Sequence, residues 1–264
     1  LCTLVKTLRP TCYVAGPAHH QAILRARKKI PRDEWKNNSL RLIVSSSASL
    51  PDGVSRELET LLGVGLTEQY ALSETGVISI NIPPRQGSVG FPVIEHIAIL
   101  DEDGNFPGKG NAGEIVVKGD TVFSGYENAP DQNKAAFING WFRTGDMGYL
   151  DRDGYLFLTG RKKELINKGG EKISPEEIDI VFRSHPGVRE AMAFSVPDPV
   201  LGEDIAAMVV LADDRVTETD LRNHLLDRMV PSKLPRRIFF VDEIPRNTAG
   251  KPLRSVGTQR YSQS

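Results

Sequence analysis

The sequence predicts a mixed α/β fold with two regions that differ in their pattern of helices, strands and charged residues. Strand-like and helix-like segments alternate in the N-terminal part, and short strands between Gly-rich turns fill residues 87–158. A charged pattern that mixes helices and strands begins near Gly160. We therefore place a domain boundary at residues 160–163, with a compact α+β unit after it.

The N-terminal part is expected to contain two helices and two strands. Residues 18–29 have helical spacing and a basic end, which suits a helix C-terminus. An apolar run at residues 40–45 predicts a buried strand, and the Ser-rich turn 45–49 follows it. Residues 51–62 have the spacing of an amphipathic helix, and residues 64–70 predict another short strand.

Residues 87–158 have the pattern of antiparallel strands. Short apolar runs, such as HIAIL, EIVVKG and GYLFLTG, alternate with Asp-Gly and Gly-rich turns. This combination is typical of hairpins.

The C-terminal region starts with a charged segment, residues 161–179, which predicts an exposed and mobile connector. Ser174 as N-cap and Pro175 at the first helical position predict a helix start. Thr217 opens another helix, which we expect to run to about Met229. Strands are expected at residues 191–196, 205–211 and 237–241.

Composition and charge narrow the function classes. The chain has 264 residues, 39% hydrophobic and 25% charged, which is ordinary for a globular protein. Its 33 Lys and Arg balance 34 Asp and Glu, so no overall field favours nucleic acid or anionic lipid as a partner. No run of 18 or more apolar residues predicts a membrane span.

The two cysteines, Cys2 and Cys12, make neither a disulfide framework nor a four-ligand zinc site. We therefore expect a cytoplasmic or other reducing intracellular compartment. The C-terminus does not match the Ser-Lys-Leu type of peroxisomal address, although a peroxisomal location stays open. Because the sequence begins at Leu1 within an apolar and basic pattern, we expect that a longer chain has been cut here.

Four short segments carry side chains suited to nucleotide chemistry, and each has a purely structural alternative. In the first, the ring of Tyr70 can stack on a purine, Ser73 can donate to a phosphate, and Glu74 can hold Mg²⁺. The alternative is a strand end with a capped turn.

The second segment, residues 141–146, ends in Asp146 on a Thr-Gly turn. This carboxylate can accept two hydrogen bonds from a ribose, each worth about 1.5–3 kcal/mol. The alternative is an Asp in an ordinary β-turn.

In the third segment Arg161 can reach ribose or phosphate, and Gly169 and Gly170 let a slender ligand pass close to the backbone. A solvated basic run is the alternative there.

The fourth segment, residues 245–251, ends in Lys251 behind a flexible glycine. A cation at this position can bridge a carboxylate and an α-phosphate. The alternative is a disordered tail, and we expect residues 245–254 to be ordered only if something binds them.

In this order and spacing, the four segments resemble the signature motifs of the adenylate-forming superfamily: acyl-CoA synthetases, peptide-synthetase adenylation domains and beetle luciferases. The resemblance covers essentially the whole chain, as the C-terminal half of such an enzyme. It implies that residues 1–160 are the C-terminal part of a large multi-layer AMP-binding domain that includes a β-rich subdomain. Residues 161–163 would then be a hinge, and residues 164–264 a small, mobile α+β lid domain.

Matching the family motifs assigns roles to single residues. The resemblance implies that Lys251 is required for adenylation, that Glu74 holds magnesium, and that the small domain rotates about Lys163. It also implies that Gly169 and Gly170 line the path of the CoA thiol. The implied nucleotide-binding residues are Ser47, Ala48, Ser49, Tyr70, Ala71, Ser73, Asp146 and Arg161.

The implied reaction joins a small carboxylic acid to coenzyme A at the expense of ATP. The acid first attacks the α-phosphate of MgATP to give an acyl-adenylate and pyrophosphate, and the thiol of CoA then displaces AMP. ATP, AMP, Mg²⁺ and CoA are therefore the expected cofactors and co-substrates.

Two features bear on which carboxylic acid is the substrate: a resemblance to one subgroup of the family, and one difference from that subgroup. Residues 47–50, 70–71 and 164–175 are most similar to the oxalate–CoA ligase and 4-coumarate–CoA ligase-like enzymes. Residues 76–78, however, replace a polar, His-containing stretch of the oxalate type, which weakens oxalate and leaves aryl and aliphatic acids open. The resemblance also implies that His20 or His19 falls near a family histidine at the acyl and thiol entrance, and plain packing or a surface position is the alternative.

The family's Ser/Thr/Gly-rich phosphate loop, which ends in Lys, does not occur in these residues. We therefore expect little or no activity from this chain by itself. The alternative function is a naturally truncated, catalytically incomplete protein that binds a nucleotide or a partner. The intact set of Glu74, Asp146, Arg161, Lys163 and Lys251 favours the ligase.

Overall fold

The computed structural model of the protein describes residues 2–47, 50, 52–247 and 250–262. The chain divides into two compact units, one of residues 1–144 with 148–158, the other of residues 145–147 with 159–264. The division therefore runs through two neighbouring strands, β9 (Trp141–Leu150) and β10 (Leu156–Arg161). The roles that we assigned to the parts around residues 160–163 stay predictions.

The first unit contains a five-stranded sheet of order β1-β2-β3-β4-β5. The first three strands are parallel and the last two are antiparallel to their neighbours. The bounds are β1 Cys12–Ala15, β2 Leu42–Ser45, β3 Leu66–Leu72, β4 Gly76–Ile80 and β5 Phe91–Pro92. The strands predicted at residues 40–45 and 64–70 correspond to β2 and β3.

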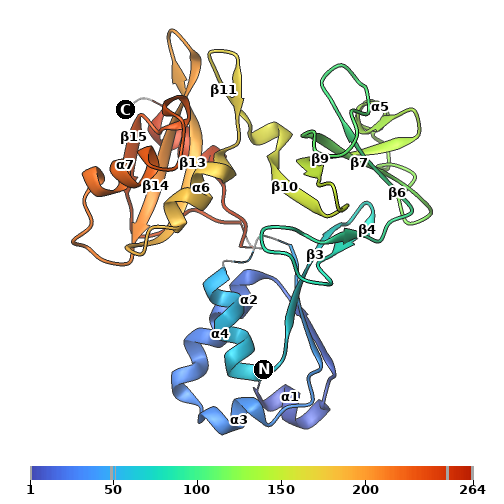
Figure 1. Ribbon diagram of the computed structural model, residues 1–264, viewed down its shortest axis with the longest axis vertical. Helices are drawn as coiled ribbons and strands as arrows, with labels where there is room; N and C mark the ends of the chain where they lie inside the picture. The colour runs from blue at the N-terminus through green and yellow to red at the C-terminus, as the bar shows by residue number, and fades with distance from the viewer. Residues whose placement is uncertain (1, 48–49, 51, 248–249, 263–264) are drawn as a thin grey trace. The chain divides into compact units, whose positions relative to one another are not determined.

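Four helices lie beside the parallel strands (Figure 1). They are α1 Cys2–Leu8, α2 Pro17–Ala26, α3 Arg32–Lys36 and α4 Asp52–Leu62. Their apolar stripes meet β2 in one core, where Ile23, Trp35, Ile43 and Leu58 are buried together. The helix expected at residues 18–29 ends as an α-helix at Ala26, and a 3₁₀ turn continues it to Lys29.

A second sheet, of order β10-β9-β7-β6 with β8 on β9, follows in the chain. The additional elements are β6 His96–Leu100, β7 Gly113–Lys118, α5 Pro130–Ala136 and β8 Phe137–Ile138. The hairpins predicted for this region are confirmed, since β6 pairs with β7, and β8 with β9, in antiparallel register.

The two sheets of the first unit share a core, in which Ile78 of β4 packs with Ile115 of β7 and Leu156 of β10. Gly90 makes the join possible. Its carbonyl accepts from the Leu156 amide at 2.9 Å in an isolated bridge, its φ is +96°, and a side chain there would overlap the carbonyl of Ile80. A glycine is needed where two backbones approach so closely.

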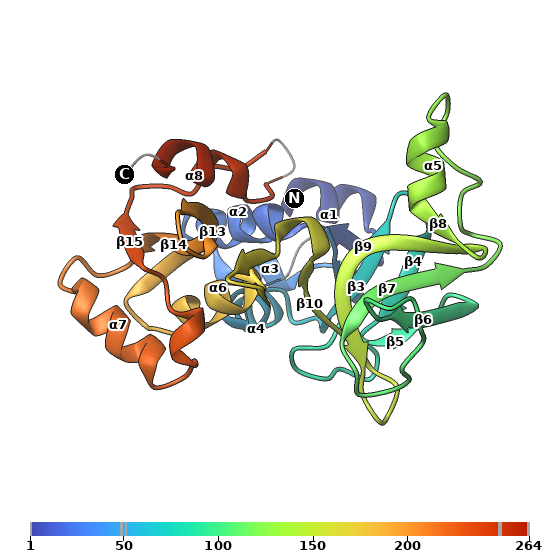
Figure 2. The ribbon, with the colours of Figure 1, turned by 90° about the horizontal axis from the view of Figure 1, so that it is seen from above.

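The second unit is a sheet of order β12-β11-β14-β13, with β15 parallel to β14. Its elements are β11 Ile166–Lys168, β12 Glu171–Ile173, α6 Pro175–Arg183, β13 Val188–Asp198, β14 Gly202–Leu211, α7 Glu218–Leu226, β15 Arg237–Phe240 and α8 Arg254–Tyr261. Helices cover both faces of this sheet (Figure 2). Ala193 and Ala207 face the core with α6 and α7, whereas Phe194 and Met208 face the core with α8, as strand alternation requires.

The expected mobile connector was wrong in part. Ile166 and Ile173 are fully buried partners in the β11–β12 hairpin, so the apolar residues of this charged segment fold it onto the sheet. Ser174 precedes α6, yet its hydroxyl makes no cap bond and lies against Gly160 instead. Thr217, by contrast, forms a complete capping box with Asp220.

Helix α7 ends at Leu226, three residues before the end that we expected. Across the described parts of the chain, no helix is long and apolar enough to cross a membrane.

Candidate functional site

The predicted nucleotide residues of the first unit lie at the carboxyl ends of the parallel strands. Ser47 follows β2, and Tyr70 and Ala71 lie near the end of β3. This edge of an open parallel sheet is where ligands of such folds bind. Ser47 is exposed with φ of +76°, while the buried hydroxyl of Ser45 has no partner among the described residues. Ala48 and Ser49 lie outside the described residues.

The β3–β4 hairpin places Ser73 and Glu74 together at its tip. Ser73 is exposed and Glu74 is half-buried, so both can meet a ligand. Tyr70 is only 7% exposed and packs into the core with Ile78. Stacking of a purine on Tyr70, which we predicted, would therefore use a ring that the protein's own side chains largely cover.

Tyr126 also lies at this tip, and it was not predicted from the sequence. Its phenol donates to Glu74 Oε1 at 3.0 Å. Burial raises the pKa of Tyr126, and the bond to Glu74 adds to this rise, so the phenol is protonated at neutral pH. No local signal connects the two residues, because they are 52 positions apart.

Asp146 and Arg161, predicted to share the ribose, are brought together in the second unit. The guanidinium Nε of Arg161 lies 3.0 Å from Asp146 Oδ1. Asp146 is 4% exposed, whereas nearly half of the Arg161 side chain is open to solvent. Adjacent strands β9 and β10 carry the two residues, which explains how the pair forms across 15 positions of sequence.

The predicted hinge and thiol-path residues are exposed. Lys163 lies in a 3₁₀ turn, residues 162–164, directly after β10. Gly169 and Gly170 form the β11–β12 turn with φ of +60° and +95°, and Gly169 donates to the carbonyl of Leu201 at 2.9 Å. The positive φ angles explain why glycines occupy this turn.

Lys251 lies in a closed loop, not in a free tail. Its amide donates to Asn247 Oδ1 at 2.9 Å, and its carbonyl accepts from the Asn247 amide at 2.9 Å. Arg246 bonds the carbonyl of Gly250 at 2.7 Å and ion-pairs with Glu190 of β13 at 2.6 Å. Our expectation that only a bound partner would order residues 245–254 was therefore wrong for the described part of this segment, because bonds within the unit hold it.

The C-terminal side of the same loop is anchored by Arg254. Its guanidinium bonds Glu164 at 2.7 Å, Asp179 of α6 at 2.8 Å and the carbonyl of Ala193 at 2.7 Å. Glu164 directly follows Lys163. The anchor therefore joins the predicted hinge segment to the loop that carries Lys251.

Comparison of the chain with known proteins identifies the family to which these segments belong. The family model of AMP-binding enzymes matches residues 1–127, and that of the AMP-binding enzyme C-terminal domain matches residues 177–251. Oxalate–CoA ligase of Arabidopsis thaliana is 42% identical over 264 residues, 97% of this chain and 51% of the relative. The chain belongs to the AMP-binding, adenylate-forming enzyme family.

Other relatives support the assignment to this family. Sulfoacetate–CoA ligase of Cupriavidus necator is 42% identical over 222 residues, covering 81% of this chain and 44% of the relative. The crystal structure of ATP-bound MatB from Rhodopseudomonas palustris superposes with a TM-score of 0.88 at 30% identity, over 99% of this chain and 52% of that one. The chain thus spans about half the length of the curated relatives that it matches.

The donor groups of the chain are compatible with a magnesium ion that is held by a single protein carboxylate. Among the described residues, no three His, Cys, Asp or Glu side chains gather as a metal site. Mg²⁺ is commonly held by one or two carboxylates, with water and substrate phosphates completing its shell. The half-buried Glu74 at the hairpin tip can supply such a carboxylate.

His20, the predicted acyl-pocket residue, is fully buried in α2. Its ring meets that of Tyr13 edge-on at 5.5 Å, and neither ring nitrogen has a hydrogen-bond partner among the described residues. Burial lowers the pKa of His20, so the ring is neutral at neutral pH. A ligand would reach His20 only if neighbouring side chains moved.

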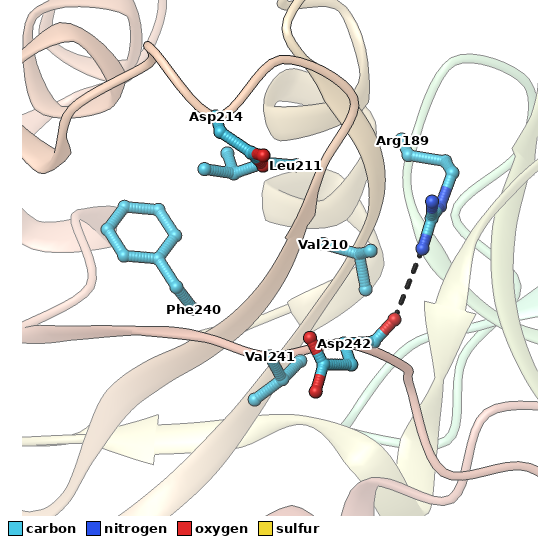
Figure 3. Close-up of a pocket in the computed structure, with 7 residues that line it drawn as sticks. All are labelled: Arg189, Val210, Leu211, Asp214, Phe240, Val241 and Asp242. Carbon is cyan, nitrogen blue, oxygen red and sulfur yellow. Dashed lines mark hydrogen bonds between the residues drawn. The ribbon is translucent and has the colours of Figure 1, made fainter.

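An open groove of about 400 Å³ lies elsewhere in the second unit (Figure 3). Its lining residues are Arg189, Val210, Leu211, Asp214, Phe240, Val241 and Asp242. Arg189 crosses it to donate to the Asp242 carbonyl at 3.1 Å. The predicted site residues are not among the residues that line this groove.

Proposed function

We propose that this chain forms the C-terminal part of an ATP-dependent acid–thiol ligase, which activates a carboxylic acid as an acyl-adenylate and transfers the acyl group to coenzyme A. The observation that carries the proposal is the Asp146–Arg161 pair. A nearly buried carboxylate with a guanidinium at 3.0 Å, on the segment that resembles the family's ribose-binding motif, is suited to hold the two hydroxyls of a nucleotide.

In the first step, a carboxylate oxygen of the acid attacks the α-phosphorus of ATP. The new O–P bond forms while the bond to the bridging oxygen breaks, and pyrophosphate leaves. Lys251 is the residue proposed to neutralise the charge that gathers on the α-phosphate in this transition state. A magnesium ion on Glu74 would supply Lewis-acid charge compensation at the phosphates.

In the second step, the thiol sulfur of CoA attacks the acyl carbon, and the bond from that carbon to AMP breaks. The small domain is proposed to turn about Lys163 between the steps, which withdraws Lys251 and presents the Gly169–Gly170 turn to the thiol. Rotation of one unit would explain why catalytic residues are divided between the two units, with Glu74 in the first and Lys251 in the second.

The acid is proposed to carry a single carboxylate. Gly76 and Val77, which follow the β3–β4 turn, offer no charged group for a second carboxylate. This favours an aryl or aliphatic acid over oxalate, even though oxalate–CoA ligase is among the relatives.

ATP–pyrophosphate exchange tests the proposal, with this chain joined to the N-terminal half of the Arabidopsis relative. Exchange above background supports the ligase, whereas AMP binding without any exchange supports the non-catalytic, nucleotide-binding alternative. Lys251→Ala should abolish exchange yet spare thioester formation from a supplied acyl-adenylate. Lys233→Ala, which removes a surface partner of Glu177, is the matched control. Equal loss of both half-reactions would contradict the role of Lys251.

A further inference from the structure

One loop holds Glu74 at two points. The loop connects β7 to α5, and its Phe123 amide donates to the Glu74 carbonyl at 2.8 Å. From the same loop the Tyr126 phenol donates to Glu74 Oε1 at 3.0 Å. Among the described residues, Tyr126 supplies the side chain that hydrogen-bonds to this carboxylate. The backbone and the carboxylate of Glu74 are thus tied to a single segment.

The loop is itself held by contacts that do not involve Glu74. Asn133 of α5 accepts from the Tyr126 amide at 2.7 Å and donates to the Tyr126 carbonyl at 2.9 Å. The Phe123 and Tyr126 rings meet edge-to-face at 4.8 Å. Gly125, with φ of +139°, leaves room for the Asn133 amide, because a side chain there would stand about 3.0 Å from it. The phenol is therefore fixed in place before any ligand binds.

This arrangement determines how the carboxylate can meet a cation. A phenol that donates to one carboxylate oxygen restricts rotation of the group and leaves the other oxygen for a second partner. Mg²⁺ demands near-ideal octahedral geometry, so the direction from which a lone protein carboxylate approaches it matters. A freely rotating Glu would lose conformational entropy on binding, and the bond from Tyr126 reduces that loss.

We propose that Tyr126 is a positioning residue, which holds the Glu74 carboxylate so that its second oxygen faces a divalent cation bound to the nucleotide phosphates. The inference rests on the proposed role of Glu74 in the ligase. Tyr126 does not itself bind the cation. It acts by orienting the group that does.

The positioning is tested without nucleotide in the 264-residue chain, by hydrogen exchange. Tyr126→Phe removes the hydroxyl and keeps the ring against Phe123. Tyr149→Phe is the matched control, since Tyr149 stacks on Phe157 and also loses only a hydroxyl. A hydrogen bond to a charged group stabilises enough that its loss should speed exchange of the Phe123 amide about tenfold. Exchange as slow as in the control would overturn the inference.

The link to the cation is tested by titrating Mn²⁺ into the chain with ATP and following its electron paramagnetic resonance. Tyr126→Phe should weaken Mn²⁺ binding in the presence of ATP by about tenfold, because the carboxylate is no longer held. The affinity for AMP without metal should equal that of the control. Equal loss of both affinities, or unchanged Mn²⁺ binding, would overturn the role of Tyr126.

The two measurements separate this inference from the proposed function. If the unchanged chain binds neither ATP nor AMP even when joined to the N-terminal half of the Arabidopsis relative, the proposed function fails, while fast exchange in Tyr126→Phe would still show that Tyr126 positions Glu74. If the chain binds nucleotide and metal normally in both variants, the proposed function stands and the role of Tyr126 is refuted.

Discussion

Arg254 and Asp179 form a buried ion pair between the start of α8 and α6. The Arg254 side chain is 14% exposed and that of Asp179 is 3% exposed, and their charged atoms are 2.8 Å apart. Asp179 also accepts from the Ala193 amide, and Arg254 donates to the Ala193 carbonyl, so both partners are bonded to β13 as well. Almost no water is left to solvate either charge if its partner is removed.

Replacing Arg254 with Met keeps a long apolar stem and removes the charge. The carboxylate of Asp179 then stays buried without a counter-charge, and breaking such a pair costs about 3–5 kcal/mol. In Arg254→Met/Asp179→Asn the buried charge is also gone, so the double variant should be more stable than Arg254→Met. The difference in stability between the two variants measures the part of the loss that is caused by the uncompensated carboxylate and not by lost packing.

The loss should depend on pH. Burial raises the pKa of Asp179, and the charge and hydrogen bond of Arg254 oppose this rise. Without Arg254 the pKa of Asp179 in the folded state rises further. A carboxyl with a raised folded pKa contributes its full stability below the unfolded pKa and loses it as pH rises through the folded pKa. Arg254→Met should therefore cost less stability at about pH 5 than at about pH 8.

Urea unfolding followed by circular dichroism measures the effect, and fluorescence supplies an internal reference. Both tryptophans, Trp35 and Trp141, lie in the first unit, so their emission reports that unit, whereas the variant is in the second. Arg215→Met is the matched control because the Arg215 side chain is 90% exposed in its pair with Asp213. A cost no greater than that of the control, or an equal cost at both pH values, would refute the reasoning.

Three further outcomes are expected. Asp146→Asn should weaken AMP binding about tenfold by calorimetry, because a charge-assisted hydrogen bond to ribose is lost; unchanged affinity would contradict ribose binding at Asp146. Thr217→Ala should lower the stability of the second unit by about 1 kcal/mol in urea unfolding, since the capping box is removed; an unchanged midpoint would argue against the cap. Gly90→Ala should destabilise the first unit by about 1–3 kcal/mol from the strained φ alone, with more from overlap at Ile80, and tryptophan fluorescence would show it. A variant as stable as the parent would show that the backbone can relax there.

Much of the fold follows from local patterns. The apolar run at residues 40–45 and the helical spacing of residues 51–62 correspond to β2 and α4, because burial of one face imposes the period of each element. Helix α8 was missed because Arg254–Tyr261 is polar apart from its few contacts with the sheet, such as those of Tyr261 with Phe239. Its helical state depends on the surface that it covers, which lies far away in sequence.

The sequence by itself determined the family and the chemistry that we propose, because four motifs occur in a fixed order at a fixed spacing. It named Asp146 and Arg161 as nucleotide-binding residues, a role that stays a prediction, and the fold places their side chains 3.0 Å apart. The burial of Tyr70 and His20, which a motif does not encode, was decided by packing around them.

Only the tertiary structure decided which groups support these residues. Tyr126 and Glu74 are 52 residues apart in the sequence, and Arg254 and Glu164 are 90 residues apart. Neither contact can therefore be predicted from the local periodicity of the sequence. Such contacts depend on strand register and on the path of a loop, which arise from the summed packing of the whole unit. The residues that would touch the nucleotide could therefore be named from sequence, whereas those that hold them in place could not.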